Sequence, residues 1–160
     1  MGPPCRMHLK SSDVLLRGCR ALGIDFGTKR IGVAVSDPTN TLATPLETLV
    51  RRAGKRPPYS RISEMATEYD IGQLVIGLPL SLDGKENEWC AEVRLMGDKL
   101  GGQLEADVAY IDERMTSVRA EQAIQAAGLP RSKRREKGRV DAAAAQLILQ
   151  AWLNNPGIAR

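Results

Sequence analysis

An aspartate inside an apolar strand is the feature that most constrains how this chain folds. Two apolar strands are predicted at residues 21–27 and 31–37, and the short turn between them predicts a β-hairpin. Because side chains alternate along a strand, the large residues of 21–27 share one face, and Asp25 lies on the other among small residues. A carboxylate on a covered face is costly without a cation, a metal or hydrogen-bond donors. Asp25 is therefore the first candidate site residue, although an aspartate beside a glycine turn also commonly caps backbone N–H groups.

The rest of the hydrophobic pattern alternates between strands and helices. Residues 41–50 predict a third strand, in which Pro45 favours an edge position or a bulge. The continuous apolar run at 74–79 is typical of a central strand covered on both faces. One more strand is expected at 108–111, and helices at about 60–70, from 89 to the Gly101-Gly102 pair, at 118–127 and at 140–153. This order predicts an α/β fold of three layers, a mixed central sheet with helices on both faces.

Length and composition favour a single globular domain. The chain has 160 residues, and we expect one domain over 20–155 with residues 1–19 as a poorly ordered extension. No apolar run approaches the ~20 residues of a membrane span, so no membrane partner is expected. The three cysteines lack a paired or metal-binding spacing, which predicts a cytoplasmic protein with neither a disulfide framework nor a zinc site. The single histidine, His8, lies in the extension, which disfavours histidine-based catalysis.

Positive charge is concentrated in one segment. The chain has a formal net charge of +4, and residues 131–139 exceed that alone, so the remainder is slightly acidic. Such concentration indicates a polyanionic partner such as nucleic acid, although a charge run is more often a solvated loop. The basic residues of this segment are Arg131, Lys133, Arg134, Arg135, Lys137 and Arg139. A second basic group flanks Pro57-Pro58 and comprises Arg51, Arg52, Lys55, Arg56 and Arg61.

Two further acidic residues stand at the ends of predicted elements. Glu113 follows the strand at 108–111, and Asp141 opens the last helix ahead of four alanines, which would let that helix start lie flat against the sheet near Asp25. Each has a plain structural explanation, a solvated strand end for Glu113 and a helix-dipole partner for Asp141. Taken with Asp25, they form a set of hard oxygen ligands that suits Mg²⁺ or Mn²⁺.

These segments resemble a known family. Residues 23–38, Gly-Ile-Asp-Phe-Gly-Thr-Lys-Arg-Ile-Gly-Val-Ala-Val-Ser-Asp-Pro, resemble the opening motif of the YqgF-type, Holliday junction resolvase-like proteins, which are also described as nucleases of the 16S ribosomal RNA precursor. Three later motifs resemble that family in order: Ile76-Gly77-Leu78-Pro79 with Asp83-Gly84, residues 112–117, and residues 140–150. The match covers about 21–154. It implies a ribonuclease-H-like (RuvC-like) fold, Asp25, Glu113 and Asp141 as catalytic and metal-binding acids, and 130–139 as a mobile loop facing the substrate.

The resulting hypothesis is a metal-dependent nuclease with a two-metal site. The ions would activate water for hydrolysis of a phosphodiester bond. Lys29 and Arg30, on the turn beside Asp25, would meet a phosphate, while Arg114 either meets a phosphate or orients neighbouring acids. The resemblance favours processing of the 5′ end of pre-16S rRNA in ribosome biogenesis, with Holliday junction resolution in DNA as the alternative. The choice between RNA and DNA, between endo- and exonuclease action and between monomer and homodimer stays open.

Two other classes of function are compatible with some of the same residues. The Asp-Phe-Gly-Thr sequence at 25–28 also opens the phosphate-binding hairpin of actin-like ATPases and sugar kinases. Those enzymes need a second domain and a second such hairpin, and this sequence contains no internal repeat. A non-catalytic module that binds RNA or the ribosome would keep the same fold, but the presence of all three acids argues against it.

Overall fold

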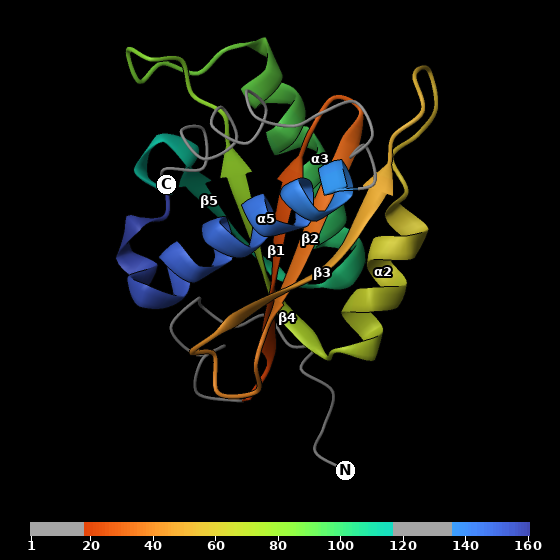
Figure 1. Ribbon diagram of the computed structural model, residues 1–160, viewed down its shortest axis with the longest axis vertical. Helices are drawn as coiled ribbons and strands as arrows, with labels where there is room; N and C mark the ends of the chain where they lie inside the picture. Colours follow the sequence, from red (N-terminus) through yellow and green to blue (C-terminus); the bar gives the residue numbers. More distant parts are fainter. Residues whose placement is uncertain (1–17, 117–135) are drawn as a thin grey trace.

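The computed structural model of the protein describes residues 18–116 and 136–160, which form a mixed sheet with helices on both faces (Figure 1). The five strands lie in the order β3-β2-β1-β4-β5, so the predicted three-layer architecture is confirmed. Their bounds are β1 (Arg20–Phe26), β2 (Arg30–Ser36), β3 (Ala43–Val50), β4 (Ile71–Leu78) and β5 (Asp107–Asp112). The helices are α2 (Tyr59–Glu68), α3 (Glu88–Leu104) and α5 (Glu136–Asn154), with short 3-10 turns η1 (Glu113–Thr116) and η3 (Pro156–Ile158). The helix predicted at 118–127 and most of the extension predicted at 1–19 lie outside the described residues.

The first three strands form an antiparallel meander that ends at the sheet edge. β1 pairs with β2 in the predicted hairpin, and β2 pairs with β3. The pairing shifts by one residue in β3, where Val33 lies opposite Glu47 and Ala34 opposite Pro45. Proline has no N–H for a strand ladder, so an edge strand with a bulge is where it is tolerated. Both features predicted from Pro45 are present.

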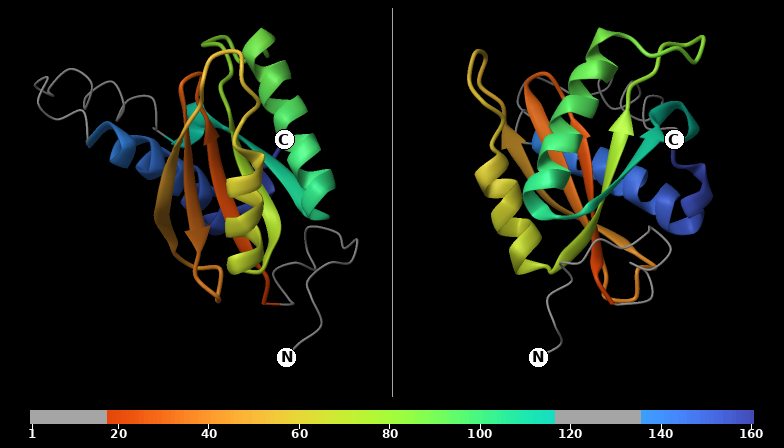
Figure 2. Two further views of the ribbon diagram at one scale, coloured as in Figure 1. Left: turned by 90° about the vertical axis from the view of Figure 1, so that its right-hand side faces the viewer. Right: turned by 180° about the vertical axis from the view of Figure 1, so that it is seen from behind.

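The two sheet faces are covered by different helices (Figure 2). On one face, the larger side chains of β1 and β4 pack against α2 and α3. On the other face, α5 packs against smaller residues of the strands. A Cβ atom added at Gly23 of β1 would lie 2.7 Å from Cβ of Leu149 and 2.8 Å from the carbonyl oxygen of Ala145. The α5 backbone therefore approaches the sheet closely at β1, as the alanine run predicts.

The predicted end of α3 is wrong. The helix passes through Gly101-Gly102 and ends at Leu104, and the next residue, Glu105, takes the left-handed conformation with φ of 52°. Gly101 lies where the helix meets β5, and a Cβ there would lie 2.5 Å from Cγ2 of Val108. Gly101 thus allows the helix to pack closely against β5, whereas the glycine pair was expected to end the helix.

Two expectations from composition have different outcomes. Among residues 18–116 and 136–160, no helix is both long enough and apolar enough to span a bilayer. Cys19, however, is disulfide-bonded, whereas Cys90 is a buried free thiol. The expectation of no disulfide is therefore wrong at Cys19. A disulfide requires two Cα atoms within about 4.4–6.8 Å, a separation that spacing along the chain does not report.

Candidate active site

Asp25 lies near the C-terminal end of β1, on the sheet face that α5 covers. Across the hairpin it pairs with Gly32 of β2. The start of α5 crosses the sheet at this glycine, because a Cβ at Gly32 would overlap the carbonyl oxygen of Asp141 and lie 3.0 Å from the amide nitrogen of Ala142. The absence of a side chain at Gly32 thus allows the backbone of Asp141 to lie over the residue that pairs with Asp25.

Glu113 reaches the same face from the opposite side of β1. It opens η1 directly after β5 and is 8% exposed, so the alternative of a solvated strand end is wrong. Its side chain lies over Gly77 of β4, where an added Cβ would be 2.8 Å from Oε1. Gly77 follows Ile76, the partner of Ile24 in the adjacent strand β1, and is therefore beside Asp25. The three predicted acids converge on one sheet face, with a glycine on either side of Asp25.

Asp141 is paired with Arg30 of the β1–β2 hairpin. The distance from Arg30 Nε to Asp141 Oδ2 is 2.7 Å, and both side chains are partly exposed. The sequence analysis predicted that Arg30 contacts a phosphate, and the structure shows it as the counter-ion of a predicted metal ligand. The ion pair engages Nε, and a guanidinium has five N–H donors, so a phosphate contact by Arg30 does not require this ion pair to open. Lys29, its neighbour on the turn, is exposed.

Arg114 orients an acid, one of the two roles that its sequence position left open. Its Nε and Nη2 atoms donate to the carboxylate of Asp112 at 3.0 and 2.7 Å, and Asp112 is almost fully buried. These hydrogen bonds lower the pKa of Asp112. The Nη1 atom donates to the carbonyl oxygen of Leu82 at 3.2 Å, which ties η1 to the loop after β4. Asp112 was not among the predicted site residues, although an aspartate two residues before an arginine at a strand end was the available signal.

The chemistry of the three acids suits a divalent cation. Carboxylate oxygens are the ligands that Mg²⁺ and Mn²⁺ prefer, and the Arg30 guanidinium already supplies a positive charge to one of them. In the part of the chain that the structure describes, no three His, Cys, Asp or Glu side chains are gathered tightly enough to hold a metal ion. The acids therefore fit a metal by donor type and by placement on one face, while their side chains do not form a closed cage.

The predicted basic segment lies largely beyond the described residues. Arg131, Lys133, Arg134 and Arg135 fall outside them. Lys137 and Arg139 belong to the start of α5, and the structure describes only their backbone. Since α5 reaches Gly32 at Asp141, this part of the chain enters the helix beside the candidate site.

Comparisons with known proteins show the family and the fold of the chain. The model of the RuvX family, described as Holliday junction resolvase, matches residues 19–155. Relatives named "Putative pre-16S rRNA nuclease" are 37% identical in Maridesulfovibrio salexigens and 41% identical in Anaeromyxobacter sp. (strain K), each over 84% of this chain and 97% and 96% of theirs. The structure of Thermus thermophilus RuvC in complex with a Holliday junction substrate has a TM-score of 0.50 and 16% identity, over 89% of this chain and 98% of that chain. This likeness confirms the predicted RuvC-like, ribonuclease-H-like fold.

Proposed function

This chain belongs to the RuvX family of Holliday junction resolvases, and on that basis we propose that it is a nuclease that hydrolyses phosphodiester bonds. The observation that carries the proposal is the convergence of Asp25, Glu113 and Asp141 on one sheet face. Gly32 and Gly77 leave room on either side of Asp25 for the α5 backbone and the Glu113 side chain. Burial of a carboxylate is costly unless the group is paired or hydrogen-bonded, so three acids on one covered sheet face favour a functional role over a packing role.

We propose that the three acids hold Mg²⁺ or Mn²⁺, as a two-metal site. When bound, such ions activate water and stabilise the leaving oxygen of a phosphodiester. The residues of the chain itself supply placement and charge. Asp25 is fixed by the β1–β2 ladder, Glu113 by its seat over Gly77, and Asp141 by α5 crossing Gly32. Lys29, exposed on the hairpin turn, is available to neutralise a phosphate beside the site.

The proposed substrate is the precursor of 16S ribosomal RNA, cleaved at its 5′ end. The names of the relatives support this choice, and the bacterial cytoplasm, where ribosomes are made, is the location that goes with it. Holliday junction cleavage is the second candidate, supported by the description of the family. Junction resolution needs two coordinated cuts and hence a symmetric homodimer, whereas processing needs one active site and a monomer suffices.

A substrate panel decides between the two candidates. The wild-type protein would be incubated in excess with a 5′-extended precursor 16S RNA fragment, a four-way DNA junction and linear strands of each, with Mn²⁺, Mg²⁺ or EDTA. Metal-dependent cleavage of the precursor alone is the expected result. Cleavage of the junction alone would contradict the RNA substrate and favour Holliday junction cleavage. Binding of nucleic acid with no cleavage of any substrate would contradict the nuclease proposal and favour a non-catalytic module.

A further inference from the structure

The second basic group of the sequence has no role in the proposed catalytic site. Arg51, Arg52, Lys55 and Arg56 lie in the turn between β3 and α2, which we call the β3–α2 basic turn (residues 51–56). Within this turn no acidic residue is present, and none of the four forms an ion pair with a described residue. Arg61 differs, because its guanidinium contacts Glu47 at 2.9 Å and Glu64 at 3.1 Å. Among the residues that the structure describes, the four positive charges of the turn therefore have no acidic partner within salt-bridge distance, whereas Arg61 has two.

Arg51 fixes this turn beside the candidate site. Its amide nitrogen donates to the carbonyl oxygen of Lys29 at 2.8 Å, and its Nη1 to the carbonyl oxygen of Gly27 at 3.5 Å. The guanidinium also lies 5.3 Å from the ring centroid of Trp89, in the first turn of α3. The hairpin turn that it contacts begins two residues after Asp25. Arg51 thus joins the basic turn to the β1–β2 hairpin and to α3.

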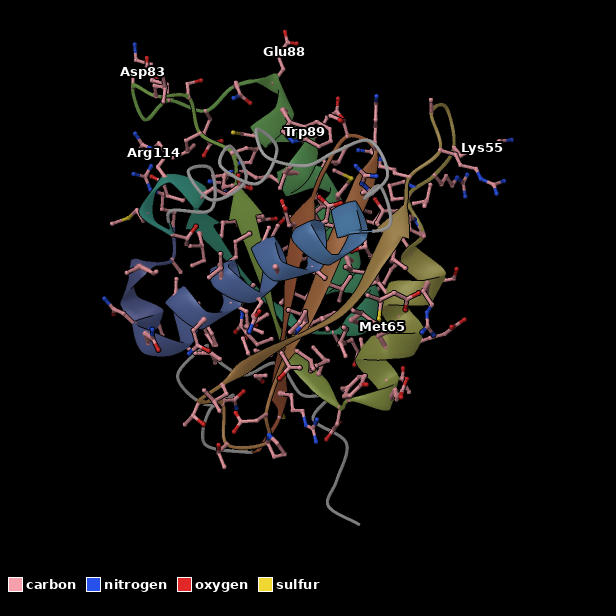
Figure 3. The ribbon with its side chains drawn as sticks, in the orientation of Figure 1. Lys55, Met65, Asp83, Glu88, Trp89 and Arg114 are labelled. Atoms are coloured by element: carbon pink, nitrogen blue, oxygen red, sulfur yellow. The ribbon has the colours of Figure 1, made fainter. Side chains whose placement is uncertain are left out.

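The remaining charges of the turn project into solvent at the end of the sheet that holds the acids. Arg52, Lys55 and Arg56 are all exposed. Figure 3 shows Lys55 at the same end of the molecule as Trp89 and Arg114, and Arg114 directly follows Glu113. Arginine and lysine side chains commonly contact phosphate oxygens of nucleic acids, and such contacts position the protein without reading the base sequence. The charge of this surface is therefore complementary to a sugar–phosphate backbone.

We propose that the β3–α2 basic turn, together with Lys29, binds the phosphate backbone of a nucleic-acid substrate that extends from the acids toward β3. This inference rests on the proposed nuclease function and adds to it the direction in which the bound substrate extends from the acids. A substrate held in this way is longer than the few nucleotides around the cut.

The test is a binding titration in EDTA, where no metal-dependent cleavage takes place. The probes are the 5′-extended precursor 16S RNA fragment and the four-way DNA junction, each titrated over a range of salt concentrations. The variant Arg52→Ala/Lys55→Ala removes two exposed charges from the turn. Arg20→Ala/Lys99→Ala is the matched control, because it removes the same charge from residues that lie over Tyr69 and Tyr59.

Log affinity falls with log salt, and the turn variant is expected to make this fall less steep by about 1.4–1.8 units of slope. The reason is that each phosphate that the protein no longer neutralises reduces the magnitude of the slope by roughly 0.7–0.9. The control variant should keep the wild-type slope. Equal slopes for the two variants would overturn the proposal, and Lys55→Glu, which changes the charge of the turn by the same two units as the double variant and should also weaken binding, provides a second check. A wild-type protein that binds in this way but cleaves nothing would contradict the nuclease function and leave the binding surface in place.

Discussion

At the scale of single residues, Asp112 and Arg114 link β5 to the loop after β4. The hydrogen bonds from Arg114 lower the pKa of Asp112 in the folded protein below its ordinary value near 4. A carboxylate with a lowered pKa stabilises the fold above its unfolded pKa, and that contribution is lost as the pH falls through the folded pKa. The Asp112 carboxylate therefore contributes fully at neutral pH and loses its contribution below about pH 4.

We expect Asp112→Asn to lower the free energy of unfolding at pH 7 by about 1–3 kcal/mol, because Arg114 loses its charged acceptor. The difference from wild type should shrink as the pH is lowered to 3. Urea unfolding followed at several pH values measures both quantities. Asp70→Asn is the control, since Asp70 is exposed and precedes β4, at the end of that strand opposite the one that pairs with Asp112. A deficit of equal size at pH 3 and pH 7 would contradict this account of Asp112.

Arg30 and a divalent cation compete for the same carboxylate. Arg30→Gln removes the 2.7 Å ion pair to Asp141. A partly exposed ion pair contributes up to about 1 kcal/mol, so we expect Mn²⁺ to bind up to about fivefold more tightly to this variant. Isothermal titration calorimetry measures the affinity directly. Lys29→Gln removes the same charge from the same turn without touching Asp141 and serves as the control. An affinity that is unchanged or weaker in Arg30→Gln would show that the ion pair does not oppose metal binding.

At the scale of elements, the glycines set how closely α5 approaches the sheet. Gly32→Ala would place a Cβ against the backbone of Asp141, which cannot rotate away. We expect a loss of stability of about 1–3 kcal/mol from overpacking, together with loss of cleavage, because Asp141 must move. Thermal unfolding and a cleavage assay report the two effects. Gly102→Ala is the control, since its Cβ would meet nothing within 4 Å and alanine is the better helix former.

The elements also show how far the sequence predicts this fold. Period-two patterns and Pro45 predicted the hairpin, the edge strand and its bulge, because each depends on local chemistry. The Gly101-Gly102 pair misled, because whether a glycine ends a helix or permits close packing depends on β5, a different part of the chain. For the site, the acids and their common face were predictable from strand ends and the alanine run. The Arg30–Asp141 pair was not predicted, and for Arg114 the orienting role was only one of two alternatives, since side-chain partners depend on the three-dimensional arrangement.

At the scale of the whole molecule, the sign and placement of charge determine how strongly the protein's binding to nucleic acid depends on salt. The net charge is only +4, but 11 of the 23 basic residues lie in two groups that both adjoin the candidate site in the chain or in space. If about five phosphates are neutralised on DNA, log affinity for a four-way junction should fall with log salt at a slope near −4 to −5. Fluorescence anisotropy at increasing KCl concentration measures this slope. A slope near zero would show that backbone charge does not drive binding.

The most direct test of the account is cleavage of the precursor RNA and junction panel by wild type and Asp25→Asn in Mn²⁺, Mg²⁺ and EDTA. Asp70→Asn is the matched control, because Asp70 is exposed and its φ of 52° suits asparagine equally well. The account predicts metal-dependent cleavage by wild type and Asp70→Asn, and at least about 100-fold slower cleavage by Asp25→Asn. Cleavage by Asp25→Asn at the wild-type rate, or cleavage that persists in EDTA, would contradict it.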